Sequence, residues 1–218
     1  MKPTLFYILV VSLASITLSS YNSSSGVGVS HDEVIIGAQV WMKKNLNAEK
    51  FRNGDPIYHA QTFEEWQKAG KNGQPAWCYY ENDLSNGEKY GKLYNWYAVN
   101  DPRGLAPKGW RIPSDSDWVK LTNFLYNRET EDMEKQLKSK QGWKDEGNGN
   151  NKTGFSALPS GSRGDNFYAI GQYGYWWSST ERDQNSVWLR IISHKDCCLD
   201  RESGFKNEGF SVRCVRDY

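Results

Sequence analysis

The sequence has little net charge, few histidines and cysteines, and a single long apolar run. Its 27 lysines and arginines against 26 aspartates and glutamates leave a formal net charge of +1. Binding to a phosphate backbone needs clustered positive charge, so we expect no nucleic-acid partner. A mean hydropathy of -0.78 excludes a polytopic membrane protein. Of the three histidines, none stands in a Ser/His/Asp or metal-ligand pattern.

Aromatic residues and glycine are abundant. Aromatic side chains make up 14% of the 218 residues, with 10 tryptophans and 20 glycines. This aromatic content is too high for a disordered chain and indicates a loop-rich fold whose core is built from rings. The length is near the upper end of what one core supports, and no linker interrupts the middle, so we expect one domain over residues 33–218.

The N-terminus has the pattern of a secretory signal peptide. Lys2 is the only charge in residues 1–20, and residues 5–18 form an almost continuous apolar run that ends in small residues. The alternative is an uncleaved anchor. Residues 18–20 resemble a lipoprotein cleavage box, but Tyr21 stands where lipidation needs cysteine. We expect a secreted or cell-surface protein, with residues 21–32 as a flexible Ser/Gly-rich tether and no membrane contact beyond the signal.

The remaining pattern predicts an α+β fold. Residues 34–36 and 40–42 flank Gly37 as a short hairpin. Helices are expected over residues 62–69, over residues 114–125 with Ser114 as the cap, and over residues 129–138. Strands are expected over residues 187–192 and 209–215. Two to three helices therefore occupy the first half, and short twisted antiparallel strands with long loops occupy the second.

Four cysteines in an exported chain suggest disulfides. A bridge between the neighbours Cys197 and Cys198 is strained, which leaves Cys214 bonded to Cys78 or to one of the vicinal pair. We favour the short-range bridge, with Cys198 to Cys214 as the specific prediction. A metal site that combines His194 with these thiols lacks the ligand spacing of a tetrahedral centre, so we expect none.

Six ordered segments together resemble a known family, the Fibrobacter succinogenes major paralogous domain. The segments are IGAQVWM (36–42) followed by Asn45-Leu46, YGKLYNWYA (90–98), PKGWRIP (107–113), GFSALP (154–159), GYWWSSTE (174–181) and GFSVRC (209–214). The resemblance implies an exported or lipoprotein-type bacterial surface protein, a C-type-lectin-like fold and no established activity. Tyr21 departs from the many lipoprotein members, which carry a cysteine there.

An enzymatic alternative comes from a second resemblance. RIPSDSDW (111–118) and the segment around Gly209 are similar to parts of formylglycine-generating enzymes, which share the lectin-like scaffold. Their copper chemistry uses two cysteines separated by four residues, whereas Cys197 and Cys198 are adjacent. The calcium-binding triplets of sugar-binding lectins are also absent, since Gln74-Pro75-Ala76 lacks the third oxygen ligand. We therefore expect no catalytic residue, no cofactor and no metal ligand in these motifs, and a calcium site of a different kind stays open as an alternative.

The candidate ligand surface centres on Trp176 and Trp177. Neighbours on an extended segment point to opposite faces, so we expect one ring to be exposed and able to stack on a sugar or to anchor a protein. Planar hydrogen-bonding groups lie nearby in the sequence: Arg163, Glu181, Arg182, Asp183 and Asn185. The sequence thus favours a non-catalytic module that binds a glycan or a surface protein. The alternative is a structural or adhesive protein that associates with itself.

Overall fold

The computed structural model describes residues 32–126, 132–195 and 198–218. The predicted signal peptide, tether residues 21–31, the start of the third predicted helix and Cys197 lie outside these ranges. The described helices are α1 (Phe63–Lys71), α2 (Leu84–Tyr90), α3 (Trp96–Val99), α4 (Asp115–Tyr126) and α5 (Met133–Leu137), with a 3-10 turn at Tyr80–Asn82. The strands are β1 (Glu33–Ile36), β2 (Gln39–Met42), β3 (Tyr58–His59), β4 (Ala76–Cys78), β5 (Leu93–Tyr94), β6 (Ser162–Arg163), β7 (Phe167–Tyr168), β8 (Tyr173–Glu181), β9 (Ser186–Ser193), β10 (Leu199–Phe205) and β11 (Val215–Asp217).

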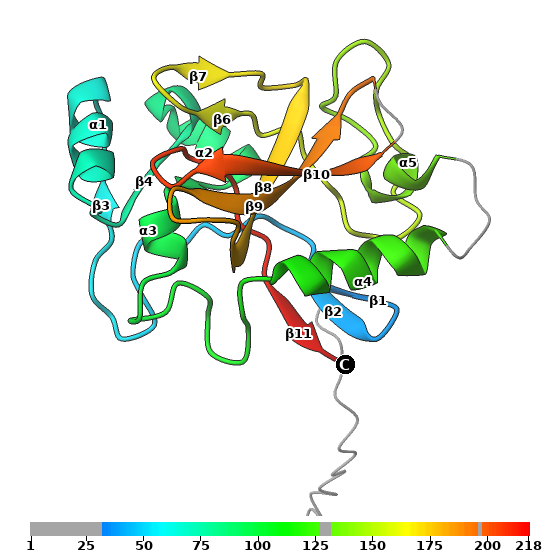
Figure 1. Ribbon diagram of the computed structural model, residues 1–218. Coiled ribbons are helices and arrows are strands. Elements are labelled where there is room, and N and C mark those ends of the chain that lie inside the picture. Colours follow the sequence, from blue (N-terminus) through cyan, green and yellow to red (C-terminus); the bar gives the residue numbers. More distant parts are fainter. Residues whose placement is uncertain (1–31, 127–131, 196–197) are drawn as a thin grey trace, which may run out of the picture.

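The described strands form four small sheets (Figure 1). The sheets have the orders β1-β2-β11, β10-β9-β8, β3-β4-β5 and β6-β7, and among these described strand pairs only β3 and β4 run in parallel. The described helices all precede residue 138, and the three longest strands, β8, β9 and β10, all follow it. The prediction of a mixed α+β fold is therefore confirmed.

The local signals read from the sequence explain where several elements begin. The Thr62 side chain accepts a hydrogen bond from the Glu65 amide, and the Glu65 side chain accepts one from the Thr62 amide, which closes a capping box at the start of α1. Ser114 and Asp117 make the equivalent exchange at the start of α4. The hairpin of β1 and β2 turns at Gly37, whose φ of +64° suits glycine.

Other elements differ from the prediction. Helices α2 and α3 are not predicted from the sequence, because α2 contains Ser85, Asn86 and Gly87 and α3 has only four residues. Residues 209–215 were expected to form one strand, but most of this segment runs between sheets without regular strand pairing. Its residues make single bridges to three separate partners: Gly209 to Arg163, Phe210 to Tyr94 and Ser211 to Trp176. Only Val215 joins a regular strand, β11.

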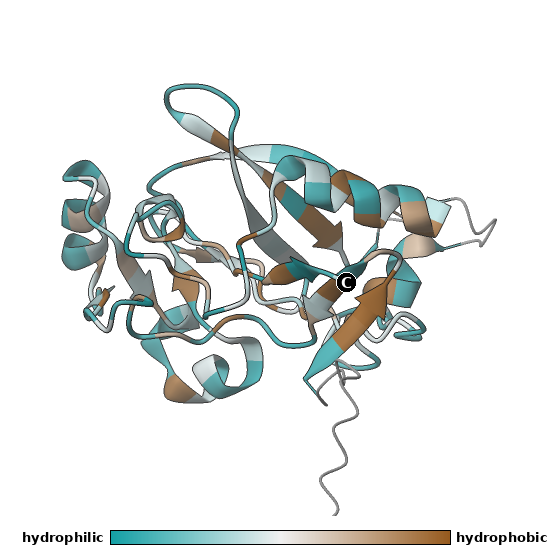
Figure 2. Ribbon diagram, turned by 90° about the horizontal axis from the view of Figure 1, so that it is seen from below, coloured by the Kyte–Doolittle hydropathy of each residue, from teal (hydrophilic) through white to brown (hydrophobic). Residues whose placement is uncertain are grey.

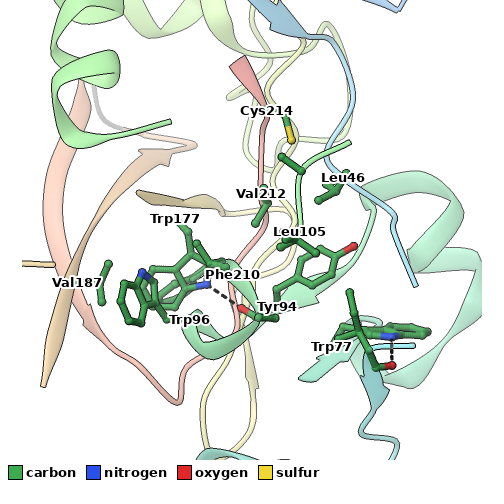
Figure 3. Packing of buried hydrophobic residues seen from close by; sticks show 14 of the residues in the cluster. Leu46, Trp77, Tyr94, Trp96, Leu105, Trp177, Val187, Phe210, Val212 and Cys214 are labelled. Carbon is green, nitrogen blue, oxygen red and sulfur yellow. Dashed lines mark hydrogen bonds between the residues drawn. The ribbon is translucent and has the colours of Figure 1, made fainter. Parts of the chain in front are cut away.

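Strand β8 runs through the middle of the interior and carries a large ring on each face. Trp177 packs in one apolar cluster with Tyr94, Trp96 and Phe210, as Figure 3 shows. Trp176 packs in a second cluster that includes Trp41, Trp118 and Phe155. An apolar cluster therefore lies on each face of β8, and the strand is covered on both sides.

A buried polar network joins the segments that carry the family resemblance. Arg213 is fully buried, and its guanidinium donates to Asn45 Oδ1 at 2.8 Å and to the Met42 carbonyl at 3.0 Å. Asn45 Oδ1 also accepts from Trp176 Nε1 at 2.9 Å, while its amide donates to the Tyr90 carbonyl. These residues come from four of the six segments, so the recognisable motifs specify the interior of the fold.

Exposed large apolar side chains are scattered over the described residues, and Ile35 of β1 and Val119 of α4 are two of them. Figure 2 shows a brown strand of the β1–β2 hairpin next to α4, whose ribbon alternates between teal and brown. Within the residues that the structure describes, no helix is both long and apolar enough to cross a bilayer.

Candidate functional site

The two tryptophans chosen from the sequence both lie in the core. Trp176 and Trp177 point to opposite faces of β8 as expected, but each has 0% of its surface exposed. Trp177 Nε1 donates to the Tyr94 carbonyl at 2.7 Å, and its ring lies 4.5 Å from that of Phe210 (Figure 3). The expectation that one ring is exposed is therefore wrong. It failed because distant segments cover both faces of the strand.

Arg163 is also buried, with 4% of its surface exposed. Its guanidinium lies 4.1 Å from the centre of the Phe167 ring, a cation–π contact. Burial lowers the pKa of this side chain, because the charged form loses water. Arg163 stabilises the contact between β6 and residues 209–211. It does not lie on the predicted ligand surface.

The other four predicted residues lie together at the end of β8 and in the loop to β9. Glu181, Arg182, Asp183 and Asn185 are all exposed. Asp183 Oδ1 accepts from the backbone amides of Asn185 and Ser186, each at 2.9 Å, and its other oxygen accepts from the Ser186 hydroxyl. These hydrogen bonds, with that from Ser186 first, lower the pKa of the Asp183 carboxyl. The loop is thus held in one conformation by its own side chain.

The end of β10 lies against this loop and contributes an exposed ring. Phe205 is 63% exposed and pairs in register with Ser186 of β9. Two side-chain contacts hold the segments together: Lys206 Nζ lies 2.8 Å from Glu181 Oε1, and Arg182 Nη1 donates to Ser203 Oγ at 2.6 Å. Figure 1 shows this end of β10 near α3.

Two hollows meet at Phe205. The first, here called the arginine hollow, measures about 440 Å³ and is lined by Arg182, Asp183, Asn185, Ser186, Ser203, Gly204, Phe205 and Glu208. The second, the amide hollow, measures about 320 Å³ and is lined by Tyr97, Gln184, Asn185, Phe205, Lys206 and Asn207. Both include Phe205 and Asn185, so an exposed ring and an amide stand between two polar depressions.

Glu208 gives the arginine hollow a partly buried carboxylate. Its Oε2 accepts from the Phe205 amide at 2.7 Å, and burial raises the pKa of this carboxyl. Gly204 makes the arrangement possible, because a Cβ there would lie 2.9 Å from Glu208 Oε2 and 2.8 Å from the Phe210 ring. Gly204, Phe205 and Glu208 are not among the site residues predicted from the sequence. A glycine directly before an aromatic residue was the signal that could have found them.

A different hollow, of about 450 Å³, includes His59 and Tyr58. The His59 ring stacks on Trp77 at 3.8 Å, and its Nε2 is buried without a hydrogen-bond partner among the described residues. Burial, and then the charge of Lys92, lower the pKa of His59. This histidine supports the packing around Trp77, and the ring of Tyr58 in this hollow is 37% exposed, less than that of Phe205 at 63%.

The cysteines are arranged differently from the prediction. Cys214 is a fully buried free thiol in the cluster around Tyr94, while Cys198 is exposed at the start of β10. The predicted bridge between Cys198 and Cys214 is therefore not formed, since one residue faces the core and the other faces solvent. Cys78 is also a free buried thiol, so the longer-range alternative is absent too. Cys197 lies outside the described residues.

The histidine considered as a metal ligand has other partners. His194 Nε2 lies 3.2 Å from Asp145 Oδ2, and Nδ1 lies 3.2 Å from the Gln172 carbonyl oxygen. Within residues 32–126, 132–195 and 198–218, no group of three or more His, Cys, Asp or Glu side chains is arranged to hold a metal ion.

The fold defines an α+β domain in which small sheets and five described helices enclose an aromatic core. The chain belongs to the Fibrobacter succinogenes major domain family, whose sequence model matches residues 34–216. The resemblance inferred from the six segments is thereby confirmed. No curated protein matches the chain.

Proposed function

We propose that this protein is an exported bacterial binding module that recognises a glycan at the Phe205 site, on a C-type-lectin-like scaffold. The observation that carries the proposal is the exposed Phe205 ring between two polar hollows. Aromatic rings present a large apolar face at little entropic cost, and surrounding amides and hydroxyls can hydrogen-bond the groups around a sugar ring.

The rigidity of the site supports this function. Asp183 holds the loop, and the contacts from Lys206 and Arg182 attach it to β10. A site that is ordered before binding loses less conformational entropy when a ligand binds. The two tryptophans stabilise the site indirectly. Their buried rings hold β8 in the core, and this loop follows directly after β8.

We also propose that the module acts without covalent chemistry. Burial raises the pKa of the Cys78 and Cys214 thiols to about 12, so both stay protonated near neutral pH. A protonated thiol is a poor nucleophile. Neither cysteine therefore resembles the reactive pair on which the formylglycine-generating relatives depend.

A glycan array with residues 21–218 tests the proposal. We expect binding to at least one class of glycan, and its loss in Phe205→Ala with little change in melting temperature. Tyr126→Ala is the matched control, because Tyr126 is an exposed ring (75%) at the end of α4, outside both hollows. Equal loss in both variants, or binding to proteins but to no glycan, would contradict the proposal.

Self-association is a second candidate function, favoured by the apolar region around the β1–β2 hairpin. Ile35 is 40% exposed and Tyr218 is 74% exposed. Ile35 lies in β1 just before the turn, and the Tyr218 amide donates to the Ala38 carbonyl, so both residues lie near this turn. A stable dimer needs about 1,000 Å² of buried surface. Size-exclusion chromatography with light scattering distinguishes a monomer from an assembly through this region.

A further inference from the structure

The charges at the Phe205 site are paired with one another. Lys206 lies 2.8 Å from the Glu181 carboxylate, and Arg182 Nε lies 3.8 Å from Asp183 Oδ2. Neither cation is therefore left without an acidic neighbour. Glu208, by contrast, has no cationic partner within the part of the chain that the structure describes. The carboxylates of Glu181, Asp183 and Glu208 outnumber the cations of Arg182 and Lys206, so the local balance leaves a weakly negative site in which each cation already faces a carboxylate.

The groups that remain available are neutral amides. The side chains of Gln184, Asn185 and Asn207 line the amide hollow, and none has a hydrogen-bond partner among the described residues. Each carries one carbonyl oxygen and one NH₂ group, so each can both accept and donate. Such groups match sugar hydroxyls, which also accept and donate, better than they match a carboxylate or a sulfate.

The shape indicates an extended ligand. Phe205 and Asn185 line both hollows, so the two hollows adjoin each other at one exposed ring. A single sugar stacked on Phe205 would leave one or both hollows unfilled. A chain that passes over the ring could place a neighbouring unit in each of them.

We propose that the ligand is an uncharged oligosaccharide chain that spans both hollows, with one sugar on Phe205 and its neighbours against Glu208 and the amides. This inference rests on the glycan-binding function proposed above. It adds two properties: discrimination against acidic sugars through Glu208, and affinity that depends on chain length through Gln184, Asn185 and Asn207.

Calorimetry with a length series of neutral oligosaccharides, and with the matching uronic-acid series, tests these properties. The neutral series comes from the class found on the array. We expect affinity to rise about tenfold or more from the monosaccharide to chains that fill both hollows. The acidic series should bind about tenfold more weakly, while high salt should change the neutral affinity less than about twofold.

Two variants locate the effects. Glu208→Gln keeps an oxygen that can accept from the Phe205 amide but removes the charge, so the ratio of neutral to acidic affinity should fall toward one. Gln184→Ala should lower the affinity for the long oligosaccharides about threefold or more, so that affinity rises less steeply with chain length. Gln141→Ala, an exposed glutamine outside both hollows, is the matched control.

The outcomes separate the two proposals. Glycan binding that requires Phe205 but favours acidic sugars, or an unchanged affinity ratio in Glu208→Gln, overturns the assignment of an uncharged ligand. Equal affinity for the monosaccharide and the long chains overturns the spanning arrangement. Binding to no glycan at all overturns the proposed function itself.

Discussion

The interior around β8 and the surface around Phe205, here called the rim, are built from different kinds of residues. The interior holds tryptophans, Arg213 and Asn45, all buried and connected by hydrogen bonds. The rim holds a single exposed phenylalanine among common polar residues. The comparison teaches that the most conspicuous residues of this sequence specify its packing, whereas the candidate ligand surface is composed of ordinary ones.

The strongest test of this comparison is Trp177→Ala. We expect a loss of about 3–5 kcal/mol in the free energy of unfolding, because a large fully buried ring is replaced by a cavity. The Tyr94 carbonyl also loses its indole donor. Chemical denaturation followed by circular dichroism measures the effect. A stability close to that of the wild type would show that Trp177 is not a core residue and would restore the twin tryptophans as ligand candidates.

Asn45→Ala tests the polar part of the interior. The substitution removes the oxygen that accepts from Arg213 and from Trp176 Nε1. We expect a destabilisation of about 3 kcal/mol, since buried donors would lose their partner. The measurement is again denaturant unfolding. Asn47→Ala is a weaker comparison in the same segment, because the Asn47 carbonyl oxygen would still accept from Lys92.

A smaller effect is expected from pH through His59. Its pKa is lowered in the folded protein by burial and by Lys92, although the nearby charges of Glu49 and Glu65 oppose this shift. Below the ordinary pKa of 6.5, the unfolded chain therefore binds a proton more readily than the folded one. Stability is retained above that pH and should fall as the pH is lowered through and below it.

Thermal unfolding between neutral and mildly acidic pH, with His59→Gln as the comparison, measures this contribution. The variant should lose less stability than the wild type over the same interval. An identical pH dependence in the two proteins would assign the acid sensitivity to other groups.

The smallest effect on stability is expected at the rim. Phe205→Ala removes a ring that is already 63% exposed, so the free energy of unfolding should change by less than about 0.5 kcal/mol. Glycan binding should nevertheless be lost. Differential scanning fluorimetry, together with the array, separates the two readouts. A large fall in melting temperature would mean that Phe205 supports the fold, and the distinction between interior and rim would then fail at this residue.

The sequence allowed prediction of features that depend on neighbouring residues. The capping boxes of α1 and α4, the hairpin at Gly37 and the strand β9 follow from short patterns, and the structure contains them. Part of the candidate site was predictable too, since Glu181, Arg182, Asp183 and Asn185 are consecutive or nearly so on one loop.

The rest depended on contacts between distant segments. Nothing near Trp176 in the sequence shows that Asn45 will accept its indole hydrogen, and nothing near Trp177 shows that Tyr94 will cover it. The 209–215 segment has the composition of a strand, but its bridge partners belong to three different sheets. Burial is a property of the assembled chain, so alternation along a strand could not decide which ring stays exposed.

The sequence by itself determined the family, the α+β class and the local caps, because each is encoded in residues that lie close together or in an ordered set of motifs. Only the tertiary structure decided the position of the candidate site. In the folded chain both faces of β8 are covered and Arg163 is buried. Phe205 and Glu208, at and after the end of β10, lie against the loop at Asp183. The physical reason is that an apolar ring is buried where other residues of the folded chain cover it, and those residues are distant from it in the sequence.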